Sequence, residues 1–264
     1  MSEDTPILFD ATRAGVGIIT LNRPERHNAF NNDVIAHLSD LFAELKGQDG
    51  LRCVLIKGSG RSFSAGADLE WMKAAAHYTH ADNVEDASAL AEMLHRLYTL
   101  PMPTIALVNG AAVGGGLGLV AACDIAIACK AAMFRFSEVH LGLTPATISP
   151  YIVEAVGPRW ARALFVTGES FDADYAERMG LVHFVVEDET ALAEEEERIV
   201  AQIFKGAPGA VRAAKKLVPD VMWREIDTGL RSETAKRIAD RRASTEGQEG
   251  LAAFLERRSP SWGG

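Results

Sequence analysis

The sequence predicts an α/β protein that ends in a helical region. Short apolar runs alternate with longer segments whose apolar residues recur at helical spacing. This alternation is typical of the α/β class. After about residue 190 the pattern changes, and the remaining segments are helical in pattern and highly charged. We therefore expect an α/β core over residues 1–190 and a helical C-terminal region over residues 191–264.

The expected strands are short and mostly apolar. Residues 17–21 form the first, which ends at Asn22-Arg23-Pro24. Asn31 or Asn32 can cap a helix whose apolar residues recur up to Leu45. The C-terminal helices form either an arm that packs on the core or on another subunit, or the last layer of the same domain. Further strands are expected over 52–57, 104–108 and 124–128, and further helices over 84–98, 191–205, 208–218, 220–242 and 246–257.

Charge and composition exclude several classes of protein. The formal net charge of −9 disfavours nucleic-acid binding, which needs a basic face, but leaves room for a small anionic ligand. No run of about 18 uncharged apolar residues is present, so we expect no membrane span. The acidic N-terminus lacks a signal-peptide pattern, which favours a cytoplasmic protein. Cys53, Cys123 and Cys129 form no CxxC pair, so we expect no metal site.

Three consecutive glycines, Gly114 to Gly116, lie between a strand and an apolar, helix-like segment. Glycines allow close approach of a ligand, and a helix N-terminus offers unpaired N–H groups to an anion or a developing oxyanion. A dinucleotide-binding loop would need glycine where Leu119 stands, and the GK[ST] of a phosphate loop is absent. The alternative is that these glycines only let a helix pack tightly on the sheet.

A second loop of small residues, Ser64 to Leu69, also follows a strand. Two loops from different strands can supply two N–H donors to one carbonyl oxygen, which is the arrangement of an oxyanion hole. Asp68 is the acidic residue of this loop. An aspartate that opens a helix is more often a cap than a catalytic acid, so we favour the cap.

Glu138 stands among apolar and small residues, between Phe136 and Leu141. A carboxyl group in apolar surroundings has a raised pKa, which suits a proton shuttle near neutral pH. The alternative is a solvent-exposed glutamate at a helix start. Asp124 begins a strand and is expected to be structural, and the orientation of His140 is not fixed by the pattern. Serine nucleophile chemistry is disfavoured because no GxSxG elbow is present.

Together these motifs resemble the enoyl-CoA hydratase/isomerase (crotonase) superfamily over nearly the whole chain. The combination of AGAD, GGG…CD and SE…LG at these distances is highly specific, although each motif alone is weak. The segments that carry the resemblance are LNRPERHNAF (21–30), FSAGADL (63–69), NGAAVGGGLGLVAACDIAIA (109–128), FSEVHLGLTP (136–145) and VGPRWARALFVTGESFDADYAERMGLV (156–182).

The resemblance implies a crotonase-like spiral of ββα units with a C-terminal helical trimerisation region, and hence a homotrimer or homohexamer. It implies an acyl-CoA substrate and no separate cofactor. It also implies that the N–H groups of Ala67 and Gly115 polarise the thioester carbonyl and that Glu138 is the acid/base. The residues that it places along the bound coenzyme A are Ala65, Gly66, Asp68, Leu69 and Gly114.

One position departs from the pattern of hydratases. Their first catalytic glutamate follows the triple glycine, where this chain has Gly118. The pair of segments GGGLGLVAACD (114–124) and SEVHLGLTPATISPY (137–151) is similar to a subgroup of methylglutaconyl-CoA or related branched glutaconyl-CoA hydratases, which favours a hydratase. A single carboxylate favours an isomerase. A third reading is an acyl-CoA-binding relative without activity. A Gly118→Glu change either restores the pair of carboxylates or fails because the pocket has adapted to glycine.

Overall fold

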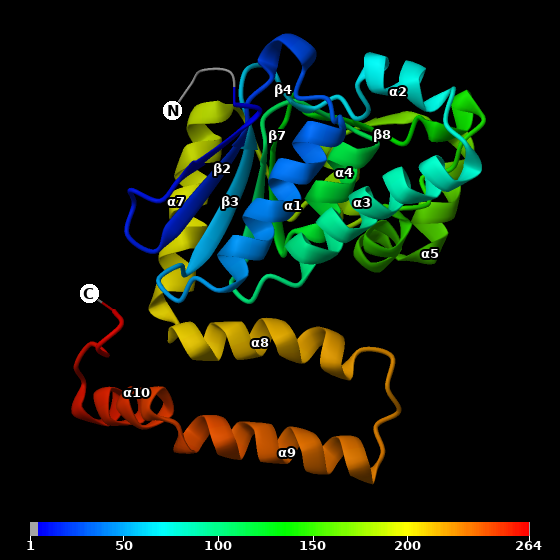
Figure 1. Ribbon diagram of the computed structural model, residues 1–264. Helices are drawn as coiled ribbons and strands as arrows, with labels where there is room; N and C mark the ends of the chain where they lie inside the picture. Colours follow the sequence, from blue (N-terminus) through cyan, green and yellow to red (C-terminus); the bar gives the residue numbers. More distant parts are fainter. Residues whose placement is uncertain (1–4, 264) are drawn as a thin grey trace. The chain divides into compact units, whose positions relative to one another are not determined.

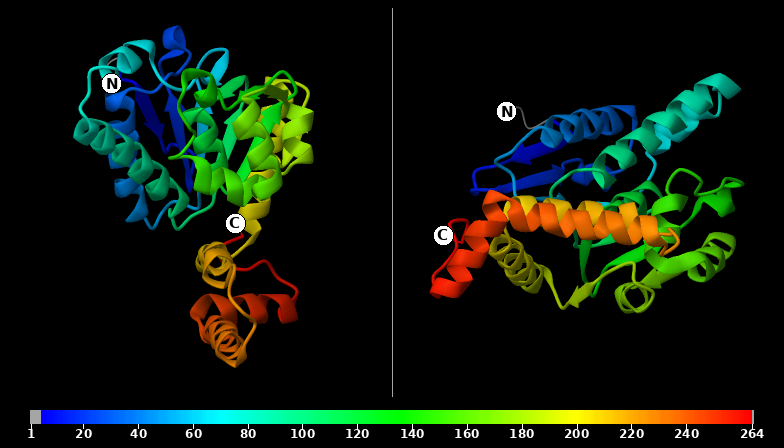
Figure 2. Two further views of the ribbon diagram at one scale, coloured as in Figure 1. Left: turned by 90° about the vertical axis from the view of Figure 1, so that its right-hand side faces the viewer. Right: turned by 90° about the horizontal axis from the view of Figure 1, so that it is seen from below.

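The computed structural model describes residues 5–263, and these divide into two compact units (Figures 1 and 2). The first unit comprises the chain up to Leu100 together with Thr104–Glu196. The second comprises Pro101–Pro103 and Glu197–Gly264. The candidate site residues all belong to the first unit.

The first unit contains a six-stranded and a four-stranded sheet. The larger sheet is parallel except that β1 is antiparallel to β2. In the smaller sheet β4, β6 and β8 are parallel and β9 is antiparallel. The larger sheet has the order β1 (Ile7–Asp10), β2 (Val16–Leu21), β3 (Cys53–Gly58), β5 (Thr104–Val108), β7 (Ile125–Cys129) and β10 (Phe184–Val186), and the smaller β4 (Ser62–Ser64), β6 (Ala111–Val113), β8 (Met133–Arg135) and β9 (Ser170–Asp172).

The two sheets are built by a repeating path of the chain. Each of β3, β5 and β7 runs in the larger sheet, and the next strand, β4, β6 or β8, runs in the smaller one before the chain turns into a helix. This ββα path confirms the crotonase-like spiral, and Figure 1 shows the helices that follow these strands. The helices of this part are α1 (Asn32–Lys46), α2 (Leu69–Ala75), α3 (His80–Tyr98), α4 (Gly115–Ala122), α5 (Ser149–Thr167), α6 (Ala173–Arg178) and the first residues of α7 (Glu189–Lys205), with the 3-10 turns η1 (Pro24–Arg26) and η2 (Glu138–Leu141).

Helix α4 is the central helix of the first unit. Its residues are almost all apolar and buried, and it contacts α3, α5, β4 and β6. A helix that is apolar on every side has to be covered on every side. The N-terminus of α4 is thereby fixed beside the ends of β4 and β6.

Most predicted elements are confirmed to within a residue or two, but the helix over 220–242 is wrong. Helix α8 (Pro208–Val221) ends inside the predicted range, and Trp223, two residues later, takes a left-handed φ of 61°. A new helix, α9 (Thr228–Ala243), begins after Asp227, whose side chain accepts the Leu230 N–H at 2.7 Å. The cap at Asp227 therefore starts a separate helix. The last helix is α10 (Thr245–Glu256).

The sequence predicts neither a membrane span nor a metal site. Among the residues that the structure describes, no helix combines the length and the apolar character needed to cross a bilayer. Across the same part of the chain, no group of three or more His, Cys, Asp or Glu side chains is placed to hold a metal ion. The three cysteines form no disulfide bond.

Candidate active site

The two loops of small residues lie against each other. They follow β4 and β6, which are neighbours in the smaller sheet and run parallel, so both loops leave the sheet at the same edge. Gly66 has φ = +86°, and a Cβ added to it would lie 2.9 Å from the Val113 carbonyl oxygen. Only glycine allows this contact at this backbone angle.

The first loop presents one open face. Ala65, Ala67 and Leu69 are exposed, whereas Gly66 and Asp68 are buried. This alternation is that of an extended chain whose successive residues face opposite sides. Of the five residues predicted to line coenzyme A in this loop and the next, the structure therefore exposes Ala65 and Leu69 and buries Gly66, Asp68 and Gly114.

Two N–H groups at this edge have no acceptor among the residues that the structure describes. Phe30 pairs with Ala67 in a parallel bridge, through Phe30 N–H to Gly66 O at 2.6 Å and Asp68 N–H to Phe30 O at 2.8 Å. In parallel pairing the N–H of the residue between these two bonds, Ala67, points away from the partner. Gly115 is the first residue of α4, so its N–H has no intrahelical acceptor. Within the described residues neither N–H forms a hydrogen bond.

Phe30 links the two loops and was missed as a site residue. Its backbone holds residues 66–68, and its buried ring packs against Gly115, where an added Cβ would lie 3.0 Å from Phe30 Cδ2. The spacing between the two N–H groups is therefore set by a residue of a third segment. The segment LNRPERHNAF contains Phe30, but nothing in its local pattern indicates a pairing 37 residues away.

Glu138 lies beside the glycine loop. A Cβ added to Gly114, which has φ = +50°, would lie 3.2 Å from Glu138 Oε1. Glu138 Oε2 is buried and has no hydrogen-bond partner among the described residues. Burial raises the pKa of this carboxyl group, and a contact with its own backbone N–H opposes the shift only in part. The predicted raised pKa is confirmed, and the side chain, although it opens the short turn η2, is half-buried.

Asp68 is a structural carboxylate. Its Oδ1 accepts the Glu70 N–H at 2.9 Å and its Oδ2 pairs with Arg23 at 2.9 Å. Burial acts to raise the pKa of Asp68, but the Glu70 N–H and the Arg23 guanidinium outweigh it and lower the pKa. The predicted helix cap is confirmed, and a group held in its ionised form is a poor proton donor.

The other two polar candidates are engaged elsewhere. Asp124 Oδ2 accepts the Thr104 N–H at 2.7 Å and its hydroxyl at 2.9 Å, so the expected structural role is confirmed. His140 Nδ1 lies 2.6 Å from Arg135 Nη2, and its Nε2 lies 3.1 Å from the Thr167 carbonyl oxygen. The sequence left the direction of His140 open, and the structure turns it toward β8 and α5.

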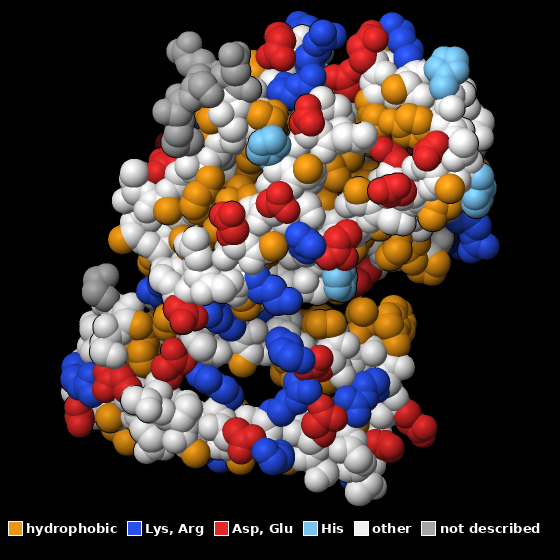
Figure 3. Space-filling view, in the orientation of Figure 1, with side chains coloured by type: hydrophobic (Ala, Val, Ile, Leu, Met, Phe, Trp, Pro, Cys, Tyr) orange, Lys and Arg blue, Asp and Glu red, His pale blue; other side chains and the backbone are white. Residues whose placement is uncertain are grey.

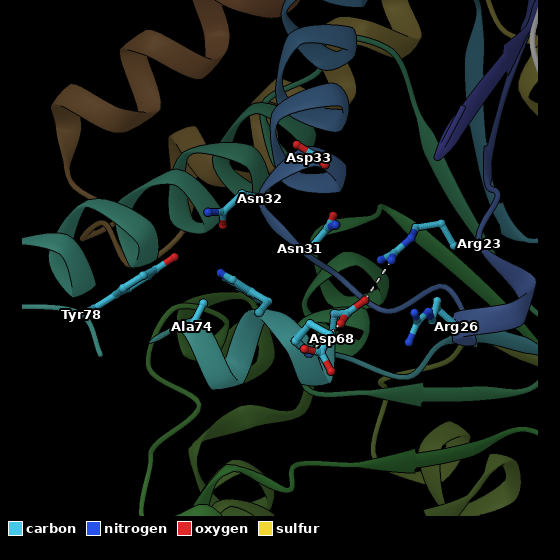
Figure 4. Close-up of a pocket in the computed structure, with 10 residues that line it drawn as sticks. Arg23, Arg26, Asn31, Asn32, Asp33, Asp68, Ala74 and Tyr78 are labelled. Carbon is cyan, nitrogen blue, oxygen red and sulfur yellow. Dashed lines mark hydrogen bonds and ion pairs between the residues drawn. The ribbon is translucent and has the colours of Figure 1, made fainter. Parts of the chain in front are cut away.

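An open pocket of about 300 Å³ lies beside the first loop (Figure 4). Asp68 of this loop is one of the residues that line the pocket, whereas Glu138 and Gly115 are not. Two guanidinium groups, three carboxylates, an indole and a phenol ring surround it, and one of the guanidinium groups, that of Arg23, is paired with Asp68. The lining residues are Arg23, Arg26, Asn31, Asn32, Asp33, Asp68, Glu70, Trp71, Ala74 and Tyr78.

Gly118 lies on α4, one turn after Gly114. The space that a side chain at this position would need is already filled by neighbouring side chains. A Cβ there would lie 2.5 Å from Ile148 Cγ2 and 3.2 Å from Leu94 Cδ1. Glu138 is thus the carboxylate beside the glycine loop whose Oε2 has no hydrogen-bond partner among the described residues, whereas Asp68, the carboxylate of the first loop, is held by the Glu70 N–H and Arg23. An apolar group stands where a second carboxylate would begin.

Comparison with known proteins gives matches along nearly the whole chain. The family model described as enoyl-CoA hydratase/isomerase matches residues 11–264. A crotonyl-CoA hydratase of Syntrophomonas wolfei is 34% identical over 94% of this chain and 94% of its own length. A 1,2-epoxyphenylacetyl-CoA isomerase of Escherichia coli is 33% identical over 95% of each chain. A crystal structure from Legionella pneumophila, assigned to the enoyl-CoA hydratase/isomerase (crotonase) group, has a TM-score of 0.93 at 44% identity and covers 98% of this chain and 99% of that one.

Proposed function

Because the chain belongs to the enoyl-CoA hydratase/isomerase (crotonase) family and is an enzyme of that type, we propose that it acts on an acyl-CoA thioester through an enolate. The Ala67 and Gly115 N–H groups bind the thioester oxygen, and Glu138 transfers the proton. The observation that carries the proposal is the Glu138 carboxyl group, whose buried Oε2 has no partner among the described residues. It lies beside the loop of Gly115, whose N–H has no acceptor in that part of the chain either.

The chemistry follows from where charge develops. When water adds to Cβ of a 2-enoyl thioester, the electron pair of the double bond moves to the thioester oxygen. Two N–H donors that already point at this oxygen stabilise the enolate more than the ground state. Protonated Glu138, favoured by the raised pKa, then gives its proton to Cα and recovers one from the added water. Atoms and charge balance, and the product is a 3-hydroxyacyl thioester.

We keep hydration as the first choice and isomerisation as the second. The family contains both, as its Syntrophomonas wolfei and Escherichia coli relatives indicate by name. The single carboxylate and the Ile148 side chain beside Gly118 favour isomerisation, in which Glu138 takes a proton from one carbon and returns it two carbons along. Resemblance of the segments 114–124 and 137–151 to branched glutaconyl-CoA hydratases favours hydration, with a branched glutaconyl-type thioester as the substrate.

Incubation in oxygen-18 water distinguishes the two reactions. A panel of 2-enoyl- and 3-enoyl-CoA thioesters, linear and branched, is offered to the enzyme and the products are analysed by mass spectrometry. We expect the best substrate to gain one labelled oxygen, because hydration places the water oxygen on Cβ. A product with a shifted double bond and no label would replace hydratase by isomerase, and turnover of none of the thioesters would leave acyl-CoA binding without catalysis.

We also propose that the enzyme is a homotrimer or a pair of trimers. Apolar side chains are exposed on the second unit, and Figure 3 shows hydrophobic side chains at the end of α8. Exposed patches of this kind are typical of surfaces between subunits. The exposed fractions are 91% for Trp223, 81% for Ile226, 80% for Phe254 and 78% for Leu255.

Light scattering coupled to gel filtration tests the assembly. We expect three or six times the mass of one chain at micromolar concentration. A Phe254→Glu/Leu255→Glu variant places two charges among the exposed apolar side chains of α10 and is expected to lower the mass. A monomer in the wild type would contradict the proposal.

A further inference from the structure

Arg135 connects the glycine loop to the strands beside it. It is the last residue of β8, where it pairs with Val113 of β6 on one side and Ser170 of β9 on the other. Its carbonyl oxygen accepts the Gly114 N–H at 3.1 Å. The backbone of Arg135 therefore fixes the start of the loop that carries Gly115.

The side chain of Arg135 reaches the C-terminal end of α5. Its Nε donates to the Gly168 carbonyl oxygen at 2.9 Å, and its Nη2 lies 2.6 Å from His140 Nδ1. The carbonyl groups at a helix C-terminus have no intrahelical donors and carry partial negative charge, so they favour a guanidinium.

His140 completes this contact with both ring nitrogens. A guanidinium has only donors, so His140 Nδ1 accepts from Arg135, and Nε2 carries the proton that it donates to Thr167 O at 3.1 Å. Gly168 lets the ring come this close, because a Cβ at that position would lie 2.8 Å from His140 Nε2. The imidazole is thus held between β8 and the end of α5.

The Glu138 side chain has no comparable support of its own. No side chain among the described residues donates a hydrogen bond to its carboxylate. Its position depends on η2, a one-turn helix with no buried residue. His140 is the residue of that turn whose side chain is hydrogen-bonded on both sides.

We propose that Arg135 and His140 are positioning residues, which hold the turn η2 so that the Glu138 carboxyl group stays beside the glycine loop. The inference rests on the proposed function, in which Glu138 is the acid/base. One residue, Arg135, binds the glycine loop through its carbonyl oxygen and the Glu138 turn through its guanidinium. The distance between the oxyanion donors and the proton donor is thereby set within one network.

Kinetics of substitutions at these two positions, on the best thioester of the panel, tests the proposal. His140→Leu removes both hydrogen bonds at similar volume, and Arg135→Met removes the guanidinium but keeps the backbone carbonyl. We expect each to lower kcat about ten-fold with KM changed less than about two-fold, because displacements of about 1 Å cost up to about 10²-fold. The double variant should be no slower than the worse single one, since both break the same network.

His140→Asn supplies the rescue. Its Oδ1 can take the place of Nδ1 and accept from Arg135. We expect it to recover kcat to within about three-fold of the wild type. The matched control is Arg96→Met, which removes an arginine that also bonds a main-chain carbonyl of another element, Ser39 O at 3.1 Å, and which is expected to leave kcat and KM unchanged.

Glu138→Gln in the same assay distinguishes a failure of the proposed function from a failure of the positioning role. If this variant keeps its turnover, the proposed role of Glu138 is wrong whatever the other variants do. If it is inactive while His140→Leu and Arg135→Met keep wild-type kcat, the positioning role alone is overturned. It is also overturned if their losses follow the thermal midpoint and His140→Asn gives no recovery, because the residues would then only stabilise the fold.

Discussion

Replacing Glu138 with glutamine is expected to lower kcat by about 10²–10⁴ with little change in KM. Glutamine keeps the size and the hydrogen-bonding capacity of the side chain but carries no transferable proton at neutral pH. The Ala67 and Gly115 N–H groups are untouched, so ligand binding should persist. Steady-state kinetics on the best thioester measures both constants.

A carboxylate on a neighbouring element provides the control for that substitution. Glu154 of α5 accepts from the Tyr98 hydroxyl at 2.9 Å, and Glu154→Gln should keep wild-type turnover. If Glu138→Gln retained more than about a tenth of wild-type kcat, general acid/base catalysis by this residue would be refuted. Asp68 is a poor candidate for the acid/base in place of Glu138, because its carboxylate is paired with Arg23.

The same variant has a pH signature in stability. Burial raises the folded-state pKa of Glu138 above its ordinary value of 4.5. Between these two values the folded chain holds a proton that the unfolded chain has lost, so the wild type loses stability as pH rises through this window. The difference in thermal midpoint, Glu138→Gln minus wild type, should be smallest below pH 4.5 and become more positive toward neutrality. A difference that does not change with pH would contradict the raised pKa.

A glutamate at position 118 is expected to destabilise the fold rather than to supply a second catalytic carboxylate. Its Cβ would lie 2.5 Å from Ile148 Cγ2, so side chains or backbone must shift. Overpacking of this kind costs about 1–3 kcal/mol, and burying an unpaired carboxylate adds to that cost. We expect a lower thermal midpoint and no faster hydration of short linear enoyl-CoAs.

The companion variant Gly118→Glu/Ile148→Ala isolates the cause. Removing the Ile148 side chain opens the space that the glutamate needs, so part of the lost thermal stability should return. A single Gly118→Glu variant that is as stable as the wild type would show that Ile148 and Leu94 move aside easily. Faster hydration in that variant would restore the pair of carboxylates as a working arrangement.

Sequence patterns predicted the local elements of the fold and the apolar surroundings that raise the pKa of Glu138. The apolar strands, the Asn31 cap and the Asp68 cap are local, and local propensity is strong there. Glu138 and the glycines are conspicuous in the sequence. A carboxylate among apolar residues and three consecutive glycines both lower the stability of a fold, so they indicate a functional role. The strands β4, β6 and β8 have only three residues each, too few for a periodic signal.

What sequence reasoning missed depends on contacts between distant segments. Ile148 meets Gly118 across 30 positions of the chain, and Phe30 meets Gly115 across 85. Arg135 and His140 are close in sequence, but their shared partner is the end of α5, near Gly168. Such contacts follow from tertiary packing, which no local pattern encodes.

The position of Phe30 has a consequence for how the enzyme meets its ligand. Its ring packs against one loop and its backbone is hydrogen-bonded to the other, so the two loops cannot separate without losing either the ring contact or the Phe30 hydrogen bonds. In the role that we propose for them, the Ala67 and Gly115 N–H groups are therefore preorganised, and their dipoles need no reorientation when negative charge appears on the ligand. The arrangement is completed once, when the chain folds, and is then ready at every turnover.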